Sequence, residues 1–300
     1  MAVWSMAAKQ HTLVVMDRRE ALRNIGATAV LPALFPAMTV ERAATSAGRL
    51  KQSVSYWPYS RIPLAQFAVQ ARQAGVVAID LLQPEEWPVV QDAGLVSSMG
   101  YPSKRRDFLT RGFNNPANHD LLVDEIEKTL PLAAAAKVPN VIAMFGNRNG
   151  IPDDRGAEAC IAGLSRVKAS AEQHGVTVCV ELLNSKVDHK DYMGDRTPWA
   201  VKVMQGVNSP RVKLLYDIYH MQIMEGDVIR TIRDHIAHIG HFHTGGVPGR
   251  NEIDDSQELN YRRVCTAIAD AGFTGYLAHE FIPKRDPLTS LAEAVKICDV

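Results

Sequence analysis

Two glutamates, an aspartate and a histidine each follow a short apolar run in the second half of the chain. They are Glu181, Asp217, His243 and Glu280. The interval from each to the next is close to the roughly 30 residues that one strand and its helix occupy in an eight-fold barrel. Because the parallel strands of such a barrel present their carboxyl ends at one rim, we expect the four side chains to converge. This oxygen-rich set suits a hard divalent ion, so the sequence predicts a site for Mg or Mn.

Apolar runs alternate with longer segments of helical periodicity from residue 51 to the C-terminus. We expect strands at 53–56, 76–82, 95–99, 138–145, 176–181, 212–217, 236–243 and 275–280. We expect helices at 64–74, 121–137, 157–174, 198–205, 228–235, 261–271 and 288–298. Eight such units in about 250 residues predict an α/β fold, a single (β/α)8 TIM barrel. No Gly-x-Gly-x-x-Gly or Walker-type loop follows an expected strand, which argues against an open nucleotide-binding sheet.

The first 49 residues differ in kind from the rest. The string Asp17-Arg18-Arg19-Glu20-Ala21-Leu22 resembles the twin-arginine export motif, and a mostly apolar stretch follows at 25–37. We therefore expect residues 1–49 to be a leader outside the fold and 50–300 to form the catalytic barrel. The expected location is periplasmic or exported, with the twin-arginine machinery as a partner. A cytoplasmic protein with an amphipathic leader stays open, as does a start at Met16.

The charge balance and the cysteines exclude several classes of protein. The 300 residues carry 33 Lys and Arg against 33 Asp and Glu, so no basic excess is present to attract nucleic acid or an anionic membrane. The four cysteines are scattered without a Cys-x-x-Cys pair, which argues against a structural zinc site and a disulfide scaffold. The expected partner is instead a small molecule, and a homo-oligomer stays open.

Four strings in the second half resemble the xylose-isomerase-like barrel superfamily, and within it the hydroxypyruvate isomerases and ketose 3-epimerases. They are Val180-Glu181-Leu182-Leu183-Asn184, Tyr216-Asp217-Ile218-Tyr219-His220-Met221-Gln222, His241-Phe242-His243 with Pro248-Gly249-Arg250-Asn251-Glu252, and His279-Glu280-Phe281. The resemblance implies a divalent metal held by Glu181, Asp217, His243 and Glu280. It also implies that the two glutamates exchange the substrate proton, that His220 orients the substrate and that Arg250 binds it.

Two positions depart from the pattern of those families. Hydroxypyruvate isomerases often carry glutamine at the position of His243, so the histidine leans towards the epimerases. Relatives usually carry a further acidic residue six positions after the metal-binding glutamate, where this chain has Val187 followed by Asp188. Either the loop brings Asp188 into that role or the substrate contact is missing.

Each candidate also has a purely structural interpretation. Glu181 after a buried strand could form an ion pair, His220 could be a satisfied core histidine, and Arg250 could be a surface charge. Weaker candidates lie at the ends of other expected strands: Tyr56, Trp57, Asp80, Asn147 and Arg148. The joint placement of the acidic residues at strand ends favours function over structure.

The expected function is a metal-dependent isomerase that interconverts a small hydroxycarbonyl compound by enediolate proton transfer, as hydroxypyruvate isomerase does. Alternatives on the same scaffold are a ketose 3-epimerase and a metal-dependent lyase or dehydratase. A metal-dependent endonuclease needs a basic face for the phosphate backbone, which the neutral charge disfavours. The non-enzymatic alternative is an exported sugar-binding protein.

Overall fold

The computed structural model describes residues 48–300. The twin-arginine motif and the apolar stretch after it lie outside the described residues, so the expected leader and its export stay predictions. In the described part of the chain, no helix is long and apolar enough to cross a membrane.

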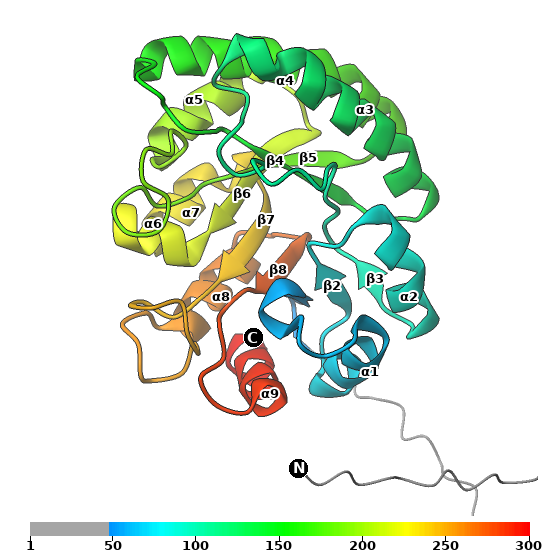
Figure 1. The fold of residues 1–300 in the computed structure, drawn as a ribbon. Helices are drawn as coiled ribbons and strands as arrows, with labels where there is room; N and C mark the ends of the chain where they lie inside the picture. The colour runs from blue at the N-terminus through cyan, green and yellow to red at the C-terminus, as the bar shows by residue number, and fades with distance from the viewer. Residues whose placement is uncertain (1–47) are drawn as a thin grey trace, which may run out of the picture. The chain divides into compact units, whose positions relative to one another are not determined.

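Eight parallel strands form one curled sheet, confirming the TIM-barrel prediction (Figure 1). The strands are β1 (Lys51–Ser55), β2 (Ala78–Asp80), β3 (Val96–Ser97), β4 (Asn140–Met144), β5 (Thr177–Glu181), β6 (Val212–Asp217), β7 (Ile239–Thr244) and β8 (Tyr276–His279). Their order is β3-β2-β1-β8-β7-β6-β5-β4, and each neighbouring pair is parallel. All carboxyl ends therefore point to one rim.

Gly100 closes the barrel between β3 and β4, the two strands at the ends of this order. Its N–H donates to the Asn140 carbonyl at 2.9 Å, and its carbonyl accepts from the Ile142 N–H at 3.0 Å. A Cβ at this position would lie 2.6 Å from the ring of Trp87. Glycine is required because the backbone must pass this close to the indole.

The helices surround the sheet (Figure 1). They are α1 (Leu64–Ala74), α2 (Trp87–Asp92), α3 (His119–Ala135), α4 (Asp153–His174), α5 (Thr197–Val207), α6 (Ile218–Met224), α7 (Val228–His235), α8 (Tyr261–Asp270) and α9 (Pro287–Cys298). Consecutive helices pack on one another along much of the ring, and α9 returns to pack on α1. Gly75 and Gly175 end α1 and α4 in the left-handed conformation that favours glycine.

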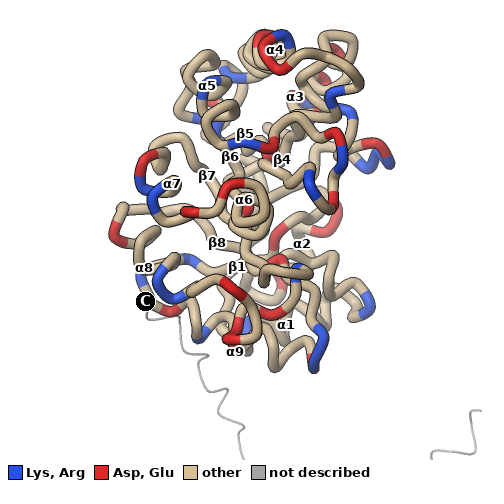
Figure 2. The backbone as a smooth tube through the Cα atoms, turned by 90° about the vertical axis from the view of Figure 1, so that its left-hand side faces the viewer, with Lys and Arg blue, Asp and Glu red and all other residues tan. Residues whose placement is uncertain are grey.

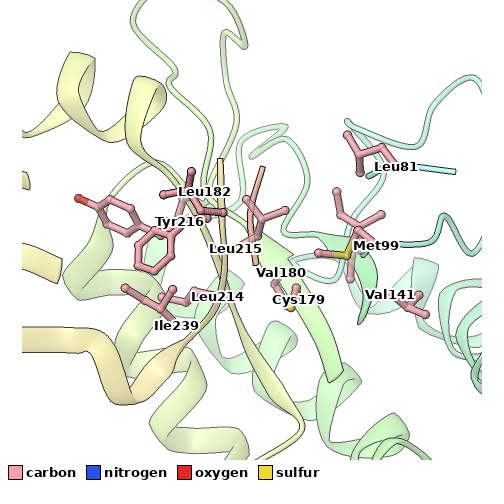
Figure 3. Close-up of a cluster of buried hydrophobic side chains, with 14 of the residues drawn as sticks. Leu81, Met99, Val141, Cys179, Val180, Leu182, Leu214, Leu215, Tyr216 and Ile239 are labelled. Atoms are coloured by element: carbon pink, nitrogen blue, oxygen red, sulfur yellow. The ribbon is translucent and has the colours of Figure 1, made fainter. Parts of the chain in front are cut away.

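The strands are buried on both faces, because helices cover the outside and side chains fill the barrel. All residues of β4 and β5 are buried. Figure 3 shows apolar side chains of this core from several strands, among them Val141, Val180 and Leu214. Figure 2 shows Lys and Arg interspersed with Asp and Glu along the chain. The four cysteines, all within the described residues, are free and buried.

The structure differs from the expected elements in the short ones. Neither α2 nor α6 was expected. The helix α2 is only six residues long and begins Trp87-Pro88, and α6 begins directly after Asp217 with no loop between. The strand expected at 236–243 begins only at Ile239, because Ile236–His238 forms a 3-10 turn. None of these differences moves a strand end that carries a candidate side chain.

Candidate active site

The structure brings the four candidate ligands together at the carboxyl rim. Glu181 and Asp217 end β5 and β6, His243 lies near the end of β7, and Glu280 follows β8. Each offers one nitrogen or oxygen atom, these atoms all lie within 4.8 Å of one another, and all four residues are buried. Residues at least 26 positions apart in sequence meet because the strands are parallel and adjacent.

His243 presents its two ring nitrogens to two different groups of carboxylates. Its Nε2 lies 2.7 Å from Asp80 Oδ2, whereas its Nδ1 lies 2.7 Å from Glu280 Oε2 and 3.3 Å from Glu181 Oε1. Nδ1 is buried and has no hydrogen-bond partner among residues 48–300, so donation of the Nε2 proton to Asp80 leaves the Nδ1 lone pair facing two carboxylates. That arrangement is stable only when a proton or a cation lies between these groups.

Asp80, at the end of β2, contacts His243 through Nε2, the ring nitrogen that does not face Glu181 and Glu280. Its Oδ2 also contacts His241 Nε2 at 3.1 Å, and its Oδ1 accepts from Ser98 Oγ at 2.8 Å. Burial alone would raise the pKa of Asp80, but the two histidines lower it, so the carboxylate is ionised. A carboxylate that fixes the orientation of a ligating histidine is a common feature of metal sites. The sequence identified Asp80 only as a weak candidate.

Arg250 is the permanent cation of the site and not a surface charge. Its Nη2 lies 2.5 Å from Glu280 Oε2 and 3.2 Å from Asp217 Oδ2. Its guanidinium also lies over the rings of Trp57 and Tyr219, at 5.5 and 5.3 Å. Burial works against the charge, but Glu280 and Asp217 raise the pKa of Arg250 overall. The arginine therefore balances part of the buried acidic charge.

The titratable groups of the cluster differ in how their pKa values are shifted. Burial raises the pKa of Asp217 to about 7 against the lowering effect of Arg250. Burial also opposes ionisation of Glu280, but Arg250 and His243 lower its pKa below the ordinary value. The pKa of His243 is raised despite burial, chiefly by Glu280. Without a bound cation, the cluster therefore keeps protons that a metal would displace.

His220 lies inside the site. Its Nδ1 lies 2.6 Å from Asn184 Nδ2, so it accepts from that amide, and its Nε2 lies 3.5 Å from Asp217 Oδ2. Within residues 48–300 this Nε2 has no hydrogen-bond partner although it is buried. Burial, followed by Arg250, holds the pKa of His220 well below its ordinary value, so the ring is neutral. The ring therefore holds one buried N–H donor that no described residue accepts.

The loop after β5 ties Asp188 to Asn184 and Tyr219 and leaves the Val187 side chain exposed. Asp188 Oδ2 accepts from Asn184 Nδ2 and from the Tyr219 hydroxyl, both at 2.7 Å. Val187 is 61 % exposed. Of the two possibilities that the sequence left open, this geometry favours a loop that places Asp188 beside His220.

A cavity of about 290 Å³ opens onto the cluster, and we call it the inner cavity. Glu181, Glu280 and Arg250 line one part, and the other part is mainly apolar. The apolar lining includes Leu81, Leu109, Ile142 and Met144. Trp57 also lines it, and its Nε1–H donates to Glu280 Oε1 at 2.6 Å.

Several lining residues were missed from the sequence. Leu81 has a left-handed backbone (φ 58°), Tyr101 follows the bridging Gly100, and His189 lies in the loop after β5. The only feature of the sequence that pointed to Leu81 as a lining residue was its position directly after Asp80 at the end of a strand. No sequence pattern pointed to His189. Burial lowers the pKa of His189, which makes it a neutral hydrogen-bonding group.

Other weak candidates have structural roles. Arg148 pairs with Asp195 at 3.1 Å and with Asp153 at 2.9 Å, which ties two rim loops together. The Tyr56 hydroxyl donates to the Ile62 carbonyl at 2.8 Å. Asn147 lies in a separate polar hollow with Asn114.

Curated proteins of similar sequence carry isomerase names. A putative human hydroxypyruvate isomerase is 27 % identical over 259 residues, covering 84 % of this chain and 86 % of that protein. The 2-oxo-tetronate isomerase of Pectobacterium atrosepticum is 25 % identical over 240 residues, covering 75 % of this chain and 89 % of that protein.

Solved structures share the fold. A family 2 AP endonuclease from Brucella melitensis superposes with a TM-score of 0.74 at 23 % identity, covering 81 % of this chain and 98 % of that one. The 3-keto-D-glucoside 4-epimerase of E. coli gives 0.69 at 16 % identity, covering 82 % and 98 %. A family model described as "Xylose isomerase-like TIM barrel" matches residues 40–298. The chain therefore belongs to the xylose isomerase-like TIM barrel family.

Proposed function

We propose that the chain is a metal-dependent isomerase that interconverts a small hydroxycarbonyl compound through an enediolate, in the manner of a hydroxypyruvate isomerase. That it is an enzyme of the isomerase or epimerase type follows from its isomerase and epimerase relatives. The observation that carries the finer proposal is the convergence of four buried ligand atoms within 4.8 Å beside a cavity that two glutamates line.

The residues present fit a divalent metal such as Mg or Mn. The unshared Nδ1 lone pair of His243 faces the carboxylates, and the other ligands are hard oxygens. Glu181, Asp217, His243 and Glu280 would hold the ion. When bound, it would act as a Lewis acid that lowers the cost of negative charge on neighbouring substrate oxygens.

Side chains of the protein would transfer the proton and position the substrate. Glu181 and Glu280 come from strands separated by β6 and β7, so one can remove the proton next to the carbonyl and the other can return it. Trp57 holds one oxygen of Glu280 in place through its Nε1–H. The free Nε2–H of His220 would orient a substrate oxygen, and Arg250 would bind a carboxylate or hydroxyl. The apolar part of the inner cavity would exclude water from the reacting carbons.

Solvent deuterium tests this proposal. The full chain, stripped with a chelator, is expected to lose exchange of deuterium into hydroxypyruvate and to regain it with Mg or Mn. Glu280→Gln is expected to eliminate the exchange, whereas Glu258→Gln, the same change at an exposed position, leaves it intact. Full activity in the metal-free protein would contradict the mechanism.

The products separate this proposal from its alternatives on the same scaffold. An isomerase moves the carbonyl and conserves mass, a 3-epimerase inverts a carbon and keeps the ketone, and a dehydratase loses water. We favour the isomerase because the relatives aligned over most of the chain carry isomerase names.

We also propose that residues 1–49 direct export through the twin-arginine pathway, on the basis of the paired arginines and the apolar stretch that follows them at 25–37. Replacing Arg18 and Arg19 by lysine is expected to abolish the appearance of a shortened protein in the periplasm. A protein that stays at full length in the cytoplasm with either sequence would contradict export.

A further inference from the structure

A second cavity adjoins the inner one at the barrel mouth, and we call it the outer cavity. Its volume is about 390 Å³. Trp57, His189 and Arg250 line both cavities, so the two meet along these side chains. Most of the remaining lining is apolar: Val187, Tyr219, Ile223, Val247, Pro248 and Ile282. A ligand seated against the carboxylates therefore lies next to the outer cavity.

Apolar side chains at this mouth are unusually exposed. Among residues 48–300, six large hydrophobic side chains are exposed, and Trp57, Val187 and Ile282 belong both to this group and to the outer cavity. Their exposed fractions are 39, 61 and 42 %. Clustered apolar exposure around a polar centre is typical of a binding site, because the cost of exposing it is recovered when a ligand covers it.

Arg250, which lines both cavities, is held in place by its neighbours. The Arg250 N–H donates to the Gly246 carbonyl at 2.8 Å, and the Arg250 carbonyl accepts from the Ile282 N–H at 2.6 Å. The rings of Trp57 and Tyr219 lie beside its guanidinium. The outer cavity is thus fixed relative to the reacting groups, and the flat ring faces suit an apolar or aromatic partner.

Size and charge limit what the outer cavity can hold. Cavities of about 300–1,000 Å³ typically enclose ligands of drug-like size, whereas a three-carbon acid fills only part of the inner cavity. Asp188 is the one carboxylate among the residues that line the outer cavity. The cation that also lines it, Arg250, is already paired with Glu280 and Asp217, so the cavity offers no unpaired cation to an anionic group. The apolar majority of the lining favours a neutral group.

We propose that the substrate is a hydroxycarbonyl compound that carries a neutral apolar group, such as an aryl group, and that this group occupies the outer cavity. The inference rests on the proposed function for the position of the hydroxycarbonyl unit at the carboxylates. It adds a second binding subsite, which makes a compact three-carbon acid a poor substrate.

A matched pair of hydroxyketones tests the subsite. The probes are 1-hydroxybutan-2-one and 1-hydroxy-4-phenylbutan-2-one, which differ in the terminal phenyl group alone, and hydroxypyruvate is the compact acid. With the full chain and Mn, we expect kcat/KM for deuterium exchange to be about tenfold higher for the phenyl compound than for either other probe, since burial of the ring lowers KM. Calorimetric titration of the two ketones is expected to give the same ratio in Kd.

Substitutions in the outer cavity locate the effect. Val187→Asp and Ile282→Asp place a charge among the apolar lining and are each expected to reduce the phenyl preference at least about fivefold. Val69→Asp is the control, because Val69 is 49 % exposed on α1 and does not line either cavity. It is expected to leave the preference unchanged.

The outcomes separate this inference from the proposed function. Equal Kd values for the two ketones, or a preference that survives both outer-cavity substitutions, would overturn the subsite. A third result would also overturn the subsite: the wild type shows no phenyl preference, sediments as a dimer, and is dissociated by both substitutions. The apolar face would then be covered by a second copy of the chain. If no probe exchanges deuterium but the phenyl preference in Kd is present and lost on substitution, the proposed function fails and the subsite stands.

Discussion

Strands β5 to β8 each bring an acidic or imidazole side chain to the centre, whereas β1 to β4 supply mainly walls. The first half of the barrel contributes Trp57, Leu81 and Met144 to the inner cavity. Its strands β2 and β3 span only three and two residues, and its closure depends on the single bridge at Gly100. Strands β6 and β7, in the second half, span six residues each.

The difference indicates a division of labour within one barrel. Four adjacent strands, β5 to β8, fix the positions of the reacting groups, as preorganised chemistry requires. The irregular half, with its left-handed Leu81, forms a surface that can be reshaped without disturbing those groups. Asp80 is the exception, because it extends from β2 to His243 on β7 and couples the halves. Four substitutions test this division.

Of these four, Glu181→Gln should have the largest effect, because it removes the charge of a proposed metal ligand together with a proton-transferring group. We expect the rate of deuterium exchange to fall about 1,000-fold, within the range of general acid–base catalysis. Met144→Leu, a change of similar size in the wall, should cost less than about tenfold. Comparable losses in the two variants would contradict the division of labour.

Asp80→Asn tests the link between the halves. The amide is nearly isosteric but no longer offers two histidines a negative charge, so His243 loses its fixed orientation. We expect affinity for Mn to fall about 10- to 100-fold, as is typical when the partner of a metal-binding histidine is removed. Titration with Mn measures this. Ser98→Ala is the control, because it removes one hydrogen bond to Asp80 but keeps the carboxylate. An unchanged affinity for Mn in Asp80→Asn would show that the position of His243 does not depend on β2.

The same division explains what could be predicted from the sequence. The second half was predictable, because acidic residues after apolar runs at barrel spacing signal a shared rim, and its motifs resemble a known family. The role of Asp80 was not, because its partners His241 and His243 are more than 160 positions away. Leu81 and His189 were missed because apolar and loop residues carry no periodic signal of where a cavity lies. The contact of Arg250 with Glu280 depends on how the loop folds back, which spacing does not encode.

Trp57→Phe should have a smaller effect, because it keeps the aromatic wall and removes only the N–H that donates to Glu280. Trp57 is 39 % exposed, so water can partly replace the lost bond. We expect kcat/KM to fall about fivefold, less than for loss of a fully buried bond to a charged group. Because the indole N–H helps to lower the pKa of Glu280, the acidic limb of the pH–rate profile should move to higher pH. A loss of rate with an unmoved profile would assign Trp57 to packing alone.

His279→Gln should have the smallest effect and probes the seam between the halves, where β8 meets β1. The imidazole Nε2 lies 3.0 Å from Gln52 Oε1, its Nδ1 lies 3.2 Å from Thr244 Oγ1, and burial lowers its pKa from 6.5 to about 3. Below pH 6.5 the unfolded chain therefore binds a proton that the folded protein rejects, so stability falls as the pH decreases towards 3.

Between about pH 7.5 and about pH 6 this histidine should cost the wild type roughly 0.8 kcal/mol of unfolding free energy. Urea unfolding of the wild type and of His279→Gln at the two pH values measures this cost. The change in unfolding free energy between the two pH values is compared between the proteins, so any pH-independent cost of the substitution cancels. If the two proteins lost stability in parallel, the seam would not hold a neutral histidine. A steeper loss in the wild type would instead mean that the seam joining the two halves weakens in mild acid.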